Sequence, residues 1–444
     1  MLDIKFIREH RDEVKAGLRK RGLDSHLVDE LFEADEQWRI FHTETNGLRA
    51  GLNVLSERIG NEKSRGDPNK VVEQAEREAR KLKTHIARQE ILDEQARGKA
   101  EELIYRIPNL PFDDVPVGPD ESANKVIRTW GEIPKFSFEP KDHVTLGEAL
   151  DIIDIERAAR VSGTRFGYFK REAVLLEFAL IQYTFDLLTS SEKLQEIAEV
   201  IARGYPSTPF IPVVPPVMIR PEVFAKMARL SAEDKGERYY IPSDDLYLAG
   251  SAEHTIGPLH MDEVLNEATL PLRYVGFSTS FRREAGSYGK DTRGVLRVHQ
   301  FDKIELESFS TPETSLNEQE FFVAVQENLL QGLGIPYQVV MISSGEMGKP
   351  DARQIDIECW LSGQGRYRET HTADLMTDYQ ARRLNTKVRR KDGRTEFVHM
   401  NDATAFAIGR TLIAILENYQ QEDGSVKIPE ALQTYMHGIK EIRR

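Results

Sequence analysis

The chain has 444 residues, enough for two or three domains and a large core. It contains no run of about 18 apolar residues, which predicts that no segment spans a membrane, and its charged start lacks the apolar stretch of a secretory signal. A net charge of −13 argues against nonspecific nucleic-acid binding by the whole surface, but a local basic strip remains compatible with it. The single cysteine, Cys359, excludes a disulfide within the chain. We expect it to be a small core residue in a protein of the reducing cytoplasm.

Residues 28–105 are predicted to form two long helices. Apolar side chains recur at spacings of three and four residues along both segments, which is the pattern of a helix–helix seam. The intervening RGDPNK at 65–70 is predicted to be a turn. Two such helices joined by a short turn make an antiparallel hairpin, and about 30 residues of helix extend roughly 45 Å. We therefore expect an N-terminal domain, residues 1–110, that carries a long arm.

The charges near the predicted tip of this arm lean positive. Between positions 46 and 65, four cations stand against two glutamates: Arg49, Arg58, Lys63 and Arg65. This weak basic signal is enough for contacts with phosphates. The alternative interpretation of the arm is a coiled coil that mediates dimerisation.

A stretch rich in proline and acidic residues at 107–122 is predicted to link the arm to a second domain, residues 111–444. In that domain we predict strands at 246–256, 271–284, 295–309 and 336–342. We also predict a helix at 190–205 and a helix buried on nearly every face at 404–420. A cation inside the last helix, Arg410, is costly to bury unless an anion meets it.

Residues 281–305, FRREAGSYGKDTRGVLRVHQFDKIE, read as a strand, a glycine-rich turn and a strand. Side chains alternate faces with period two, so Arg282 shares a face with Glu284, and Arg297 shares one with Phe301 and Glu305. Guanidinium groups, an aromatic ring and a carboxylate together suit a nucleotide. A solvated hairpin with ion pairs is the alternative. The apolar flanks favour a ligand-binding face, since buried charges need partners.

Four segments together resemble the bacterial-type seryl-tRNA synthetases, which are class II aminoacyl-tRNA synthetases. They are residues 142–166, VVPPVMI at 213–219, the segment 281–305, and AIGRTLIAILENYQQEDGSVKIPEALQTYM at 407–436. The resemblance implies an α+β fold: an antiparallel sheet flanked by helices, with an N-terminal helical hairpin arm. It also implies a homodimer, tRNA(Ser) as partner, and ATP, Mg²⁺ and serine as ligands. The implied reaction forms an aminoacyl adenylate and then transfers the aminoacyl group to the 3′ end of the tRNA.

The resemblance also implies roles for the ATP-binding residues. Arg282 would bridge the α-phosphate and the substrate carboxylate, and Arg297 and Arg410 would bind the outer phosphates. Glu284 would accept a hydrogen bond from the adenine amino group, and Phe301 would stack on the adenine. An ideal strand from Arg297 to Glu305 spans about 27 Å, so we expect Arg297 near the loop, with its side chain reaching in. The magnesium ligands would be Glu369 and Thr372, although a locally bonded strand hydroxyl is an alternative role for the threonine.

Serine binding is implied for a further set of residues, which departs from the family pattern: Ser251, Glu253, Arg282, Glu305, Asn401, Asp402 and Thr404. Asp402 falls where the family has asparagine. In one interpretation Asp402 faces the pocket, accepts a hydrogen bond from the serine hydroxyl, and would also favour a second ammonium. In the other, which we favour, Asp402 caps the buried helix and Asn401 shifts into the pocket. His254 and His371 also differ from the family, and beside an acidic pocket they are expected to carry charge.

Two alternatives to a serine–tRNA ligase stay open. One is a paralogue that activates a different amino acid or loads a carrier protein. The other is a catalytically retired RNA-binding homologue, which predicts broken ATP motifs.

Overall fold

The computed structural model describes residues 1–65, 69–231, 234–285 and 293–444. Part of the predicted turn at 65–70 and of the glycine-rich turn at 281–305 therefore lies outside the described residues. The chain divides into two compact units, Met1–Pro108 and Asn109–Arg444.

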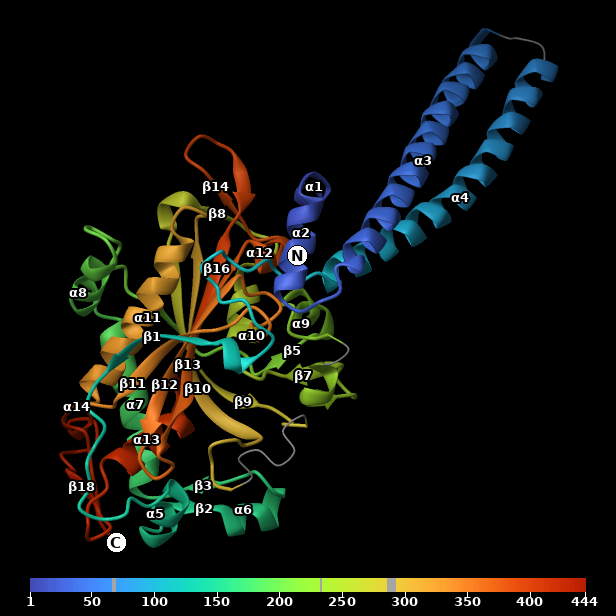
Figure 1. The fold of residues 1–444 in the computed structure, drawn as a ribbon. Coiled ribbons are helices and arrows are strands. Elements are labelled where there is room, and N and C mark those ends of the chain that lie inside the picture. The colour runs from blue at the N-terminus through green and yellow to red at the C-terminus, as the bar shows by residue number, and fades with distance from the viewer. Residues whose placement is uncertain (66–68, 232–233, 286–292) are drawn as a thin grey trace. The chain divides into compact units, whose positions relative to one another are not determined.

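The first unit contains two short helices and the predicted hairpin arm. Helices α1 (Ile4–Glu9) and α2 (Arg11–Lys20) precede α3 (His26–Arg65) and α4 (Asn69–Arg106). The two long helices run side by side in opposite directions (Figure 1). Their small and branched apolar side chains form the buried seam, among them Ala75, Ala79 and Ile86. The predicted antiparallel helical hairpin is confirmed.

The second unit is built on an eight-stranded sheet with the order β1-β11-β12-β13-β16-β10-β9-β4 (Figure 1). Neighbouring strands are antiparallel except β4, which runs parallel to β9. The strands are β1 (Lys125–Trp130), β4 (Ile211–Val213), β9 (Leu272–Phe281), β10 (Gln300–Ser310), β11 (Tyr337–Met341), β12 (Arg353–Leu361), β13 (Arg366–Thr377) and β16 (His399–Ala407). The class II fold with an antiparallel sheet is thus confirmed.

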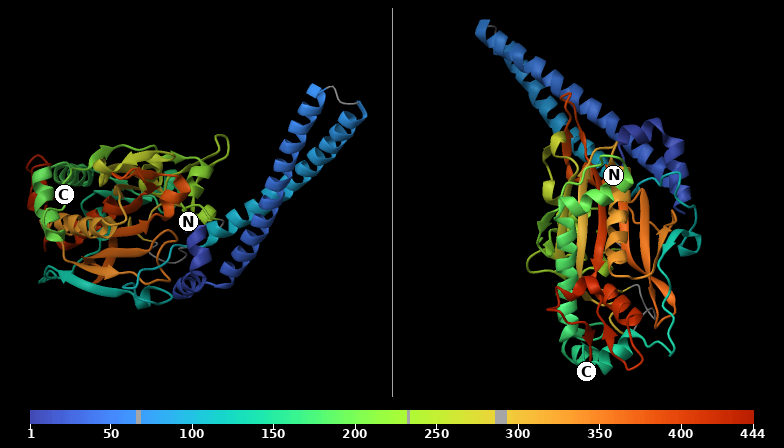
Figure 2. Two further views of the ribbon diagram at one scale, coloured as in Figure 1. Left: turned by 90° about the horizontal axis from the view of Figure 1, so that it is seen from above. Right: turned by 90° about the vertical axis from the view of Figure 1, so that its left-hand side faces the viewer.

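The two faces of this sheet differ in chemistry. Helix α11 (Ser315–Gly332) lies along one face (Figure 1, Figure 2), against the apolar side chains of β10, β13 and β16. Gln326 of α11 donates to the carbonyls of Thr372 and Thr404, which ties the helix to two strands. The other face carries hydroxyl and carboxylate side chains along the same strands. A buried polar face requires hydrogen bonds, ion pairs or a ligand.

Further helices complete the core: α7 (Glu172–Leu188), α8 (Ser191–Ile201) and α13 (Ile408–Asn418). Shorter helices are α5 (His143–Ala149), α6 (Ile155–Ser162), α9 (Pro221–Lys226), α10 (Glu253–Ile256), α12 (Tyr379–Leu384) and α14 (Glu430–Gln433), with 3-10 turns at Glu121–Ala123, Asp234–Glu237, Gly257–His260 and Glu267–Thr269. Small sheets pair β2 (Ile153–Asp154) with β3 (Tyr168–Phe169), β17 (Val426–Lys427) with β18 (Glu441–Ile442), β7 (Leu246–Leu248) with β5 (Met218–Ile219) and β6 (Tyr240–Ile241), and β14 (Lys387–Arg389) with β8 (Val264–Asn266) and β15 (Thr395–Phe397).

Three predicted elements are wrong in part. The strand predicted at 246–256 is β7 only as far as Leu248, and α10 occupies the end of that range. The strand predicted from 295 begins at Gln300. The helix predicted from 404 begins at Ile408, because residues 404–407 hydrogen bond as a strand. A continuous apolar run in the sequence does not distinguish a buried strand from a buried helix. Here residues 404–407 form a strand because they pair with the neighbouring strand β10.

Among the described residues, no single helix is long and apolar enough to cross a membrane; α7 and α8 pass such a test only as a pair bent by 69°.

Candidate active site

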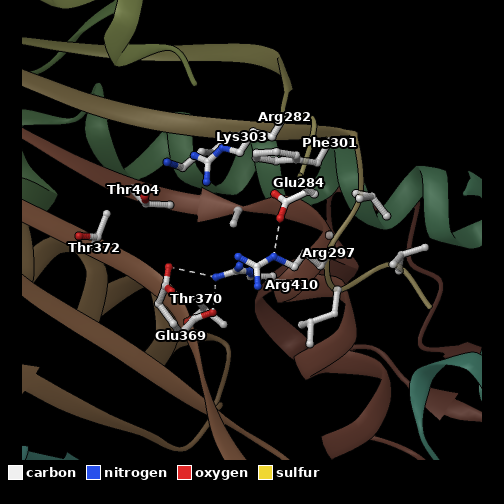
Figure 3. Close-up of a pocket in the computed structure, with 15 residues that line it drawn as sticks. Arg282, Glu284, Arg297, Phe301, Lys303, Glu369, Thr370, Thr372, Thr404 and Arg410 are labelled. Atoms are coloured by element: carbon white, nitrogen blue, oxygen red, sulfur yellow. Dashed lines mark hydrogen bonds and ion pairs between the residues drawn. The ribbon is translucent and has the colours of Figure 1, made fainter. Parts of the chain in front are cut away.

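The polar face of the sheet opens into a cavity between the ends of β9, β10, β13 and β16 and the start of α13 (Figure 3). Its lining combines three arginines, a lysine, two carboxylates, an aromatic ring and three threonines: Arg282, Glu284, Arg297, Phe301, Lys303, Glu369, Thr370, Thr372, Thr404 and Arg410. All seven residues that the sequence assigned to ATP are in this set. A second hollow continues from Arg297, Glu369 and Arg410 toward Arg366 and Arg368.

Arg282 and Phe301 form one wall of the cavity. Arg282 follows the last residue of β9, and its Nε donates to the carbonyl of Gly250 at 3.0 Å. The carbon of its guanidinium lies 5.2 Å from the ring centroid of Phe301. The backbone bond fixes one side of the guanidinium, and its terminal nitrogens point toward the cavity (Figure 3). Such a fork is suited to two oxygens at once.

Glu284 and Arg297 meet across the loop between β9 and β10. The Nε of Arg297 donates to Oε2 of Glu284 at 2.5 Å. Arg297 lies outside β10, so the face that period two assigned to it together with Phe301 and Glu305 does not exist. Its guanidinium nevertheless reaches the cavity from the loop, as the length argument predicted.

Arg410 and Glu369 close the opposite wall. Nη1 of Arg410 donates to Oε1 of Glu369 at 3.0 Å and to the carbonyl of the same residue at 2.8 Å. Desolvation by the cavity walls opposes the charge of Glu369, whose side chain is still 54% exposed, but Arg410, Arg282 and Lys303 together lower the pKa of this carboxyl. The third residue of α13 therefore meets an anion, and the cost of a cation beside an apolar helix is offset.

A β-bulge at Thr370 brings Glu369 and Thr372 to the same face of β13. The register on β12 steps from Ile357 opposite His371 to Glu358 opposite Glu369, which leaves Thr370 as the extra residue. In a regular strand, two residues three positions apart point to opposite faces of the sheet. The extra residue of the bulge shifts the alternation by one, so that Glu369 and Thr372 point to the same face. The Thr372 hydroxyl also donates to Oδ1 of Asp374 at 3.2 Å.

The donor set at this wall fits Mg²⁺. Carboxylate and hydroxyl oxygens are the hard ligands that this ion takes, and it commonly uses one or two protein ligands while phosphates and water supply the rest. Among the described residues, no group of three or more His, Cys, Asp or Glu side chains is arranged to hold a metal alone. The fit is therefore to an ion that arrives with phosphate oxygens.

A second cluster of polar side chains centres on Glu305 of β10. Ser251 Oγ donates to Glu305 Oε1 at 2.9 Å, and Thr404 Oγ1 donates to the same oxygen at 3.3 Å. Lys303 forms an ion pair with Glu305 and donates to Ser251 Oγ at 3.1 Å. A bulge between β10 and β16 places Thr404, two residues before Phe406, beside Glu305. Burial nevertheless raises the pKa of Glu305 to about 8, with Lys303 opposing.

Glu253 begins α10, and His254 lies against it. Nδ1 of His254 accepts the backbone N–H of Gly250 at 3.0 Å, and Nε2 is 3.3 Å from Glu253 Oε1. Burial lowers the pKa of His254 well below its usual value, and burial lowers that of His371 to about 3. This burial, at 2% and 1% exposure, opposes the expectation that these histidines carry charge.

Asp402 does not cap α13, so the interpretation favoured from the sequence is wrong. It lies in the middle of β16, between Glu307 on β10 and Asp374 on β13, and α13 begins after Ala407 without a side-chain cap. Asn401 faces the other side of the sheet, where its Nδ2 donates to the carbonyl of Ser315 at 3.2 Å. Strand alternation thus removes Asn401 from the pocket face and puts Asp402 on it.

Two cations at this site, Lys303 and Arg229, were not predicted from the sequence. Lys303 lies between Phe301 and Glu305 at the spacing of two that identifies a shared strand face, so the period itself was a signal for it. Arg229 follows α9 and reaches three buried carboxylates. Its Nη2 lies 3.4 Å from Asp402, 3.7 Å from Asp374 and 3.8 Å from Asp351. No local motif marks this residue.

Cys359 lies on β12 with 1% exposure, and burial raises the pKa of its thiol to about 12. The prediction of a small core residue is confirmed.

Three of the four basic residues predicted to serve the arm form ion pairs within it. Arg49 pairs with Glu90, Arg58 with Glu62, and Lys63 with Glu76. Arg65 is an exposed residue at the end of α3. Exposed pairs of this kind contribute little to stability and can exchange partners.

Comparison with known proteins agrees with this geometry. Residues 239–419 match the tRNA synthetase class II core domain (G, H, P, S and T), and residues 1–111 match the seryl-tRNA synthetase N-terminal domain. The site and the sheet thus define a class II aminoacyl-tRNA synthetase.

Full-length relatives narrow the class. The chain is 41% identical to a serine–tRNA ligase of Dictyoglomus turgidum, with 100% of this chain and 99% of the relative aligned, and 38% identical to one of Nitrosopumilus maritimus over the full length of both. A crystal structure of seryl-tRNA synthetase from Pyrococcus horikoshii complexed with ATP superposes with a TM-score of 0.87 at 40% identity, covering 100% and 99% of the two chains. The chain belongs to the seryl-tRNA synthetase family.

Proposed function

We propose that the protein is an ATP-dependent ligase that activates serine as seryl adenylate and transfers the seryl group to the 3′ end of tRNA(Ser). The observation that carries this proposal is the cavity that holds the ATP residues together with Lys303 and Thr404. Both of these side chains contact Glu305, which also accepts a hydrogen bond from Ser251. A retired homologue would not be expected to keep every element of this set in place.

In the activation step, a carboxylate oxygen of serine attacks the α-phosphorus of ATP. A new oxygen–phosphorus bond forms, the α–β anhydride bond breaks, and pyrophosphate leaves. Arg282 contacts both reacting groups and stabilises the charge that develops at phosphorus. Phe301 stacks on the adenine, Glu284 accepts from its amino group, and Arg297 and Arg410 bind the outer phosphates. Positioning and charge neutralisation account for the chemistry.

Mg²⁺ would be held by Glu369 and the Thr372 hydroxyl together with phosphate oxygens. When bound, it supplies charge neutralisation at the phosphates.

At the other end, Glu253 and Glu305 face the serine ammonium, and Ser251 and Thr404 supply hydroxyls around it. Thr404 lines the cavity directly. Asp402 lies on the same face one step further along β16.

The remaining parts of the proposal concern the arm, the assembly and the compartment. The helical arm binds tRNA(Ser) with Arg49, Arg58, Lys63 and Arg65 near the phosphates. The protein forms a homodimer and acts in the cytoplasm, for which the single reduced cysteine is suited.

Serine-dependent exchange of labelled pyrophosphate into ATP, followed by charging of tRNA(Ser), tests this function. Exchange with serine well above that with alanine or threonine is the expected result. Exchange with another amino acid but not with serine would contradict it.

A further inference from the structure

The polar face of the sheet carries two rows of side chains, one behind the other. Glu305, Thr404 and Thr372 form the first row, on β10, β16 and β13. Glu307, Asp402 and Asp374 form the second row on the same strands. Glu307 is opposite Asp402, and Asp402 is opposite Asp374, so the three carboxylates of the second row are direct neighbours. Successive residues on one strand face are about 6.7 Å apart, which places the second row one side-chain length behind the first.

The second row has too little positive charge around it. Glu307 is fully buried, and neither of its carboxylate oxygens has a hydrogen-bond partner among the described residues. Asp402 and Asp374 are 3% and 5% exposed, and both lie within 4 Å of Arg229, which is shared with Asp351. Lys303 also acts on Asp402, but it is ion-paired with Glu305. A buried carboxylate without a partner is costly.

The chemistry of this row indicates what would bind there. Three kinds of partner satisfy buried carboxylates: a proton, a metal ion, or an organic cation. The described residues do not form a group able to hold a metal. In the ligand-free protein a proton can neutralise one of these carboxyls and let it donate a single hydrogen bond, whereas an ammonium offers three donors and a charge.

The position of the second row indicates which part of a bound substrate could place an ammonium there. Thr404 and Thr372 line the cavity and stand directly in front of Asp402 and Asp374. Glu305, at the amino acid end of the site, is two residues before Glu307 on the same strand. The side chain of an amino acid whose α-ammonium lies at Glu253 and Glu305 is therefore the group closest to the second row.

We propose that Glu307 and Asp402 form a subsite for a cationic side chain, so that the pocket activates an α-amino acid with a short side chain ending in an ammonium as well as serine. This inference rests on the proposed function, because it uses the same adenylate-forming step. The carboxylate of the diamino acid attacks the α-phosphorus, the new oxygen–phosphorus bond forms, and pyrophosphate leaves. The second ammonium takes no part in bond making and serves for recognition.

Pyrophosphate exchange with the full-length protein tests the subsite. The amino acids are serine, 2,3-diaminopropionate, in which an ammonium replaces the serine hydroxyl, 2,4-diaminobutyrate, and alanine as the side chain without a polar group. Exchange with at least one diamino acid, at a kcat/KM at least about tenfold above that with alanine, is expected. Glu307→Gln and Asp402→Asn keep the shape of the side chains and remove one charge each. Each should lower kcat/KM for the diamino acid at least about tenfold more than that for serine.

The matched control is Ser308→Ala, which alters the neighbouring residue of β10 on the opposite face of the sheet and should change neither value. Thermal melting of each variant distinguishes loss of the folded state from loss of amino acid recognition. If the Glu307 variant does not fold, the Asp402 variant alone tests the subsite. Exchange with serine and none with either diamino acid would overturn the subsite and leave the proposed function intact. Equal losses for serine and the diamino acid in both folded variants would also overturn it. Absence of exchange with every amino acid would overturn the proposed function itself.

Discussion

At the scale of single residues, Arg282 is the cavity side chain that we propose to contact both ATP and the amino acid. Its Nε is held by the Gly250 carbonyl, and its outer nitrogens face the cavity beside Phe301. The developing charge at phosphorus is stabilised by such a pre-positioned donor. Arg282→Ala should lower kcat for serine-dependent pyrophosphate exchange by about 10²–10³-fold.

The matched control for this change is Arg283→Ala, because the adjacent arginine does not line the cavity. It should retain exchange within about twofold of the wild type, a difference far below the effect of removing a phosphate clamp. Near-normal exchange by the Arg282 variant would contradict the assignment.

Asp402 predicts a pH dependence of stability in the ligand-free protein. Burial, with the neighbouring carboxylates adding to it and Arg229 opposing, raises the pKa of Asp402 to about 7. The folded state then holds a proton that the unfolded state has released, so the contribution of Asp402 to stability is most favourable at low pH and falls as pH rises from about 4 to 7. The slope for this group is about 1.4 kcal/mol per pH unit. The groups that face it are Arg229, Glu253, Lys303, Glu305, Glu307, Asp351 and Asp374.

Asp402→Asn removes this titration. The difference in free energy of unfolding between variant and wild type should therefore move in favour of the variant between pH 5 and pH 7, by about 2–3 kcal/mol. Chemical denaturation at both pH values measures it. A difference that does not change with pH would show that Asp402 is ionised throughout.

At the scale of elements, the arm is separable from the catalytic chemistry. The ion pair between Arg49 and Glu90 marks a level at which α3 and α4 face each other. Residues 50–89 can be replaced there by a short glycine-containing turn that leaves the base of both helices in place. We expect adenylate formation to stay within about twofold of the wild type, because the cavity lies wholly in residues 282–410.

The same variant should lose charging of tRNA(Ser) by at least about 100-fold, since contacts with the RNA backbone supply much of the affinity. Charging by aminoacylation of tRNA transcripts measures this, with pyrophosphate exchange as the internal control. Retention of normal charging would assign the arm a purely structural role.

At the scale of the whole molecule, an exposed apolar edge predicts association. Strand β4 is the edge strand of the large sheet, and the segment after it is exposed, with Ile211 at 44% and Val214 at 84%. Apolar residues on an unpaired edge favour pairing with a second chain. The protein should therefore sediment at twice the mass of one chain.

Val214→Asp should shift this equilibrium toward the monomer by at least about tenfold, because a charge would be buried at the interface. Val200→Asp is the matched control, since Val200 on α8 is 81% exposed. Analytical ultracentrifugation over a concentration series distinguishes the two. Equal behaviour of both variants would place the dimer contact elsewhere.

The sequence by itself determined the helical arm and the class of fold, and its resemblance to a known family indicated the residues proposed to bind ATP. These features are local: seams repeat every three or four residues, and the arginine, glutamate and aromatic positions lie within short segments. Only the tertiary structure decided which side chains surround Glu305. Bulges at Thr370 and beside Thr404 change which side chains share a face of the sheet. A shift of one residue moves each following side chain of the strand to the opposite face. Arg229 and the row formed by Glu307, Asp402 and Asp374 come from four separate segments, so only the paired strands and the turn after α9 bring their charges together.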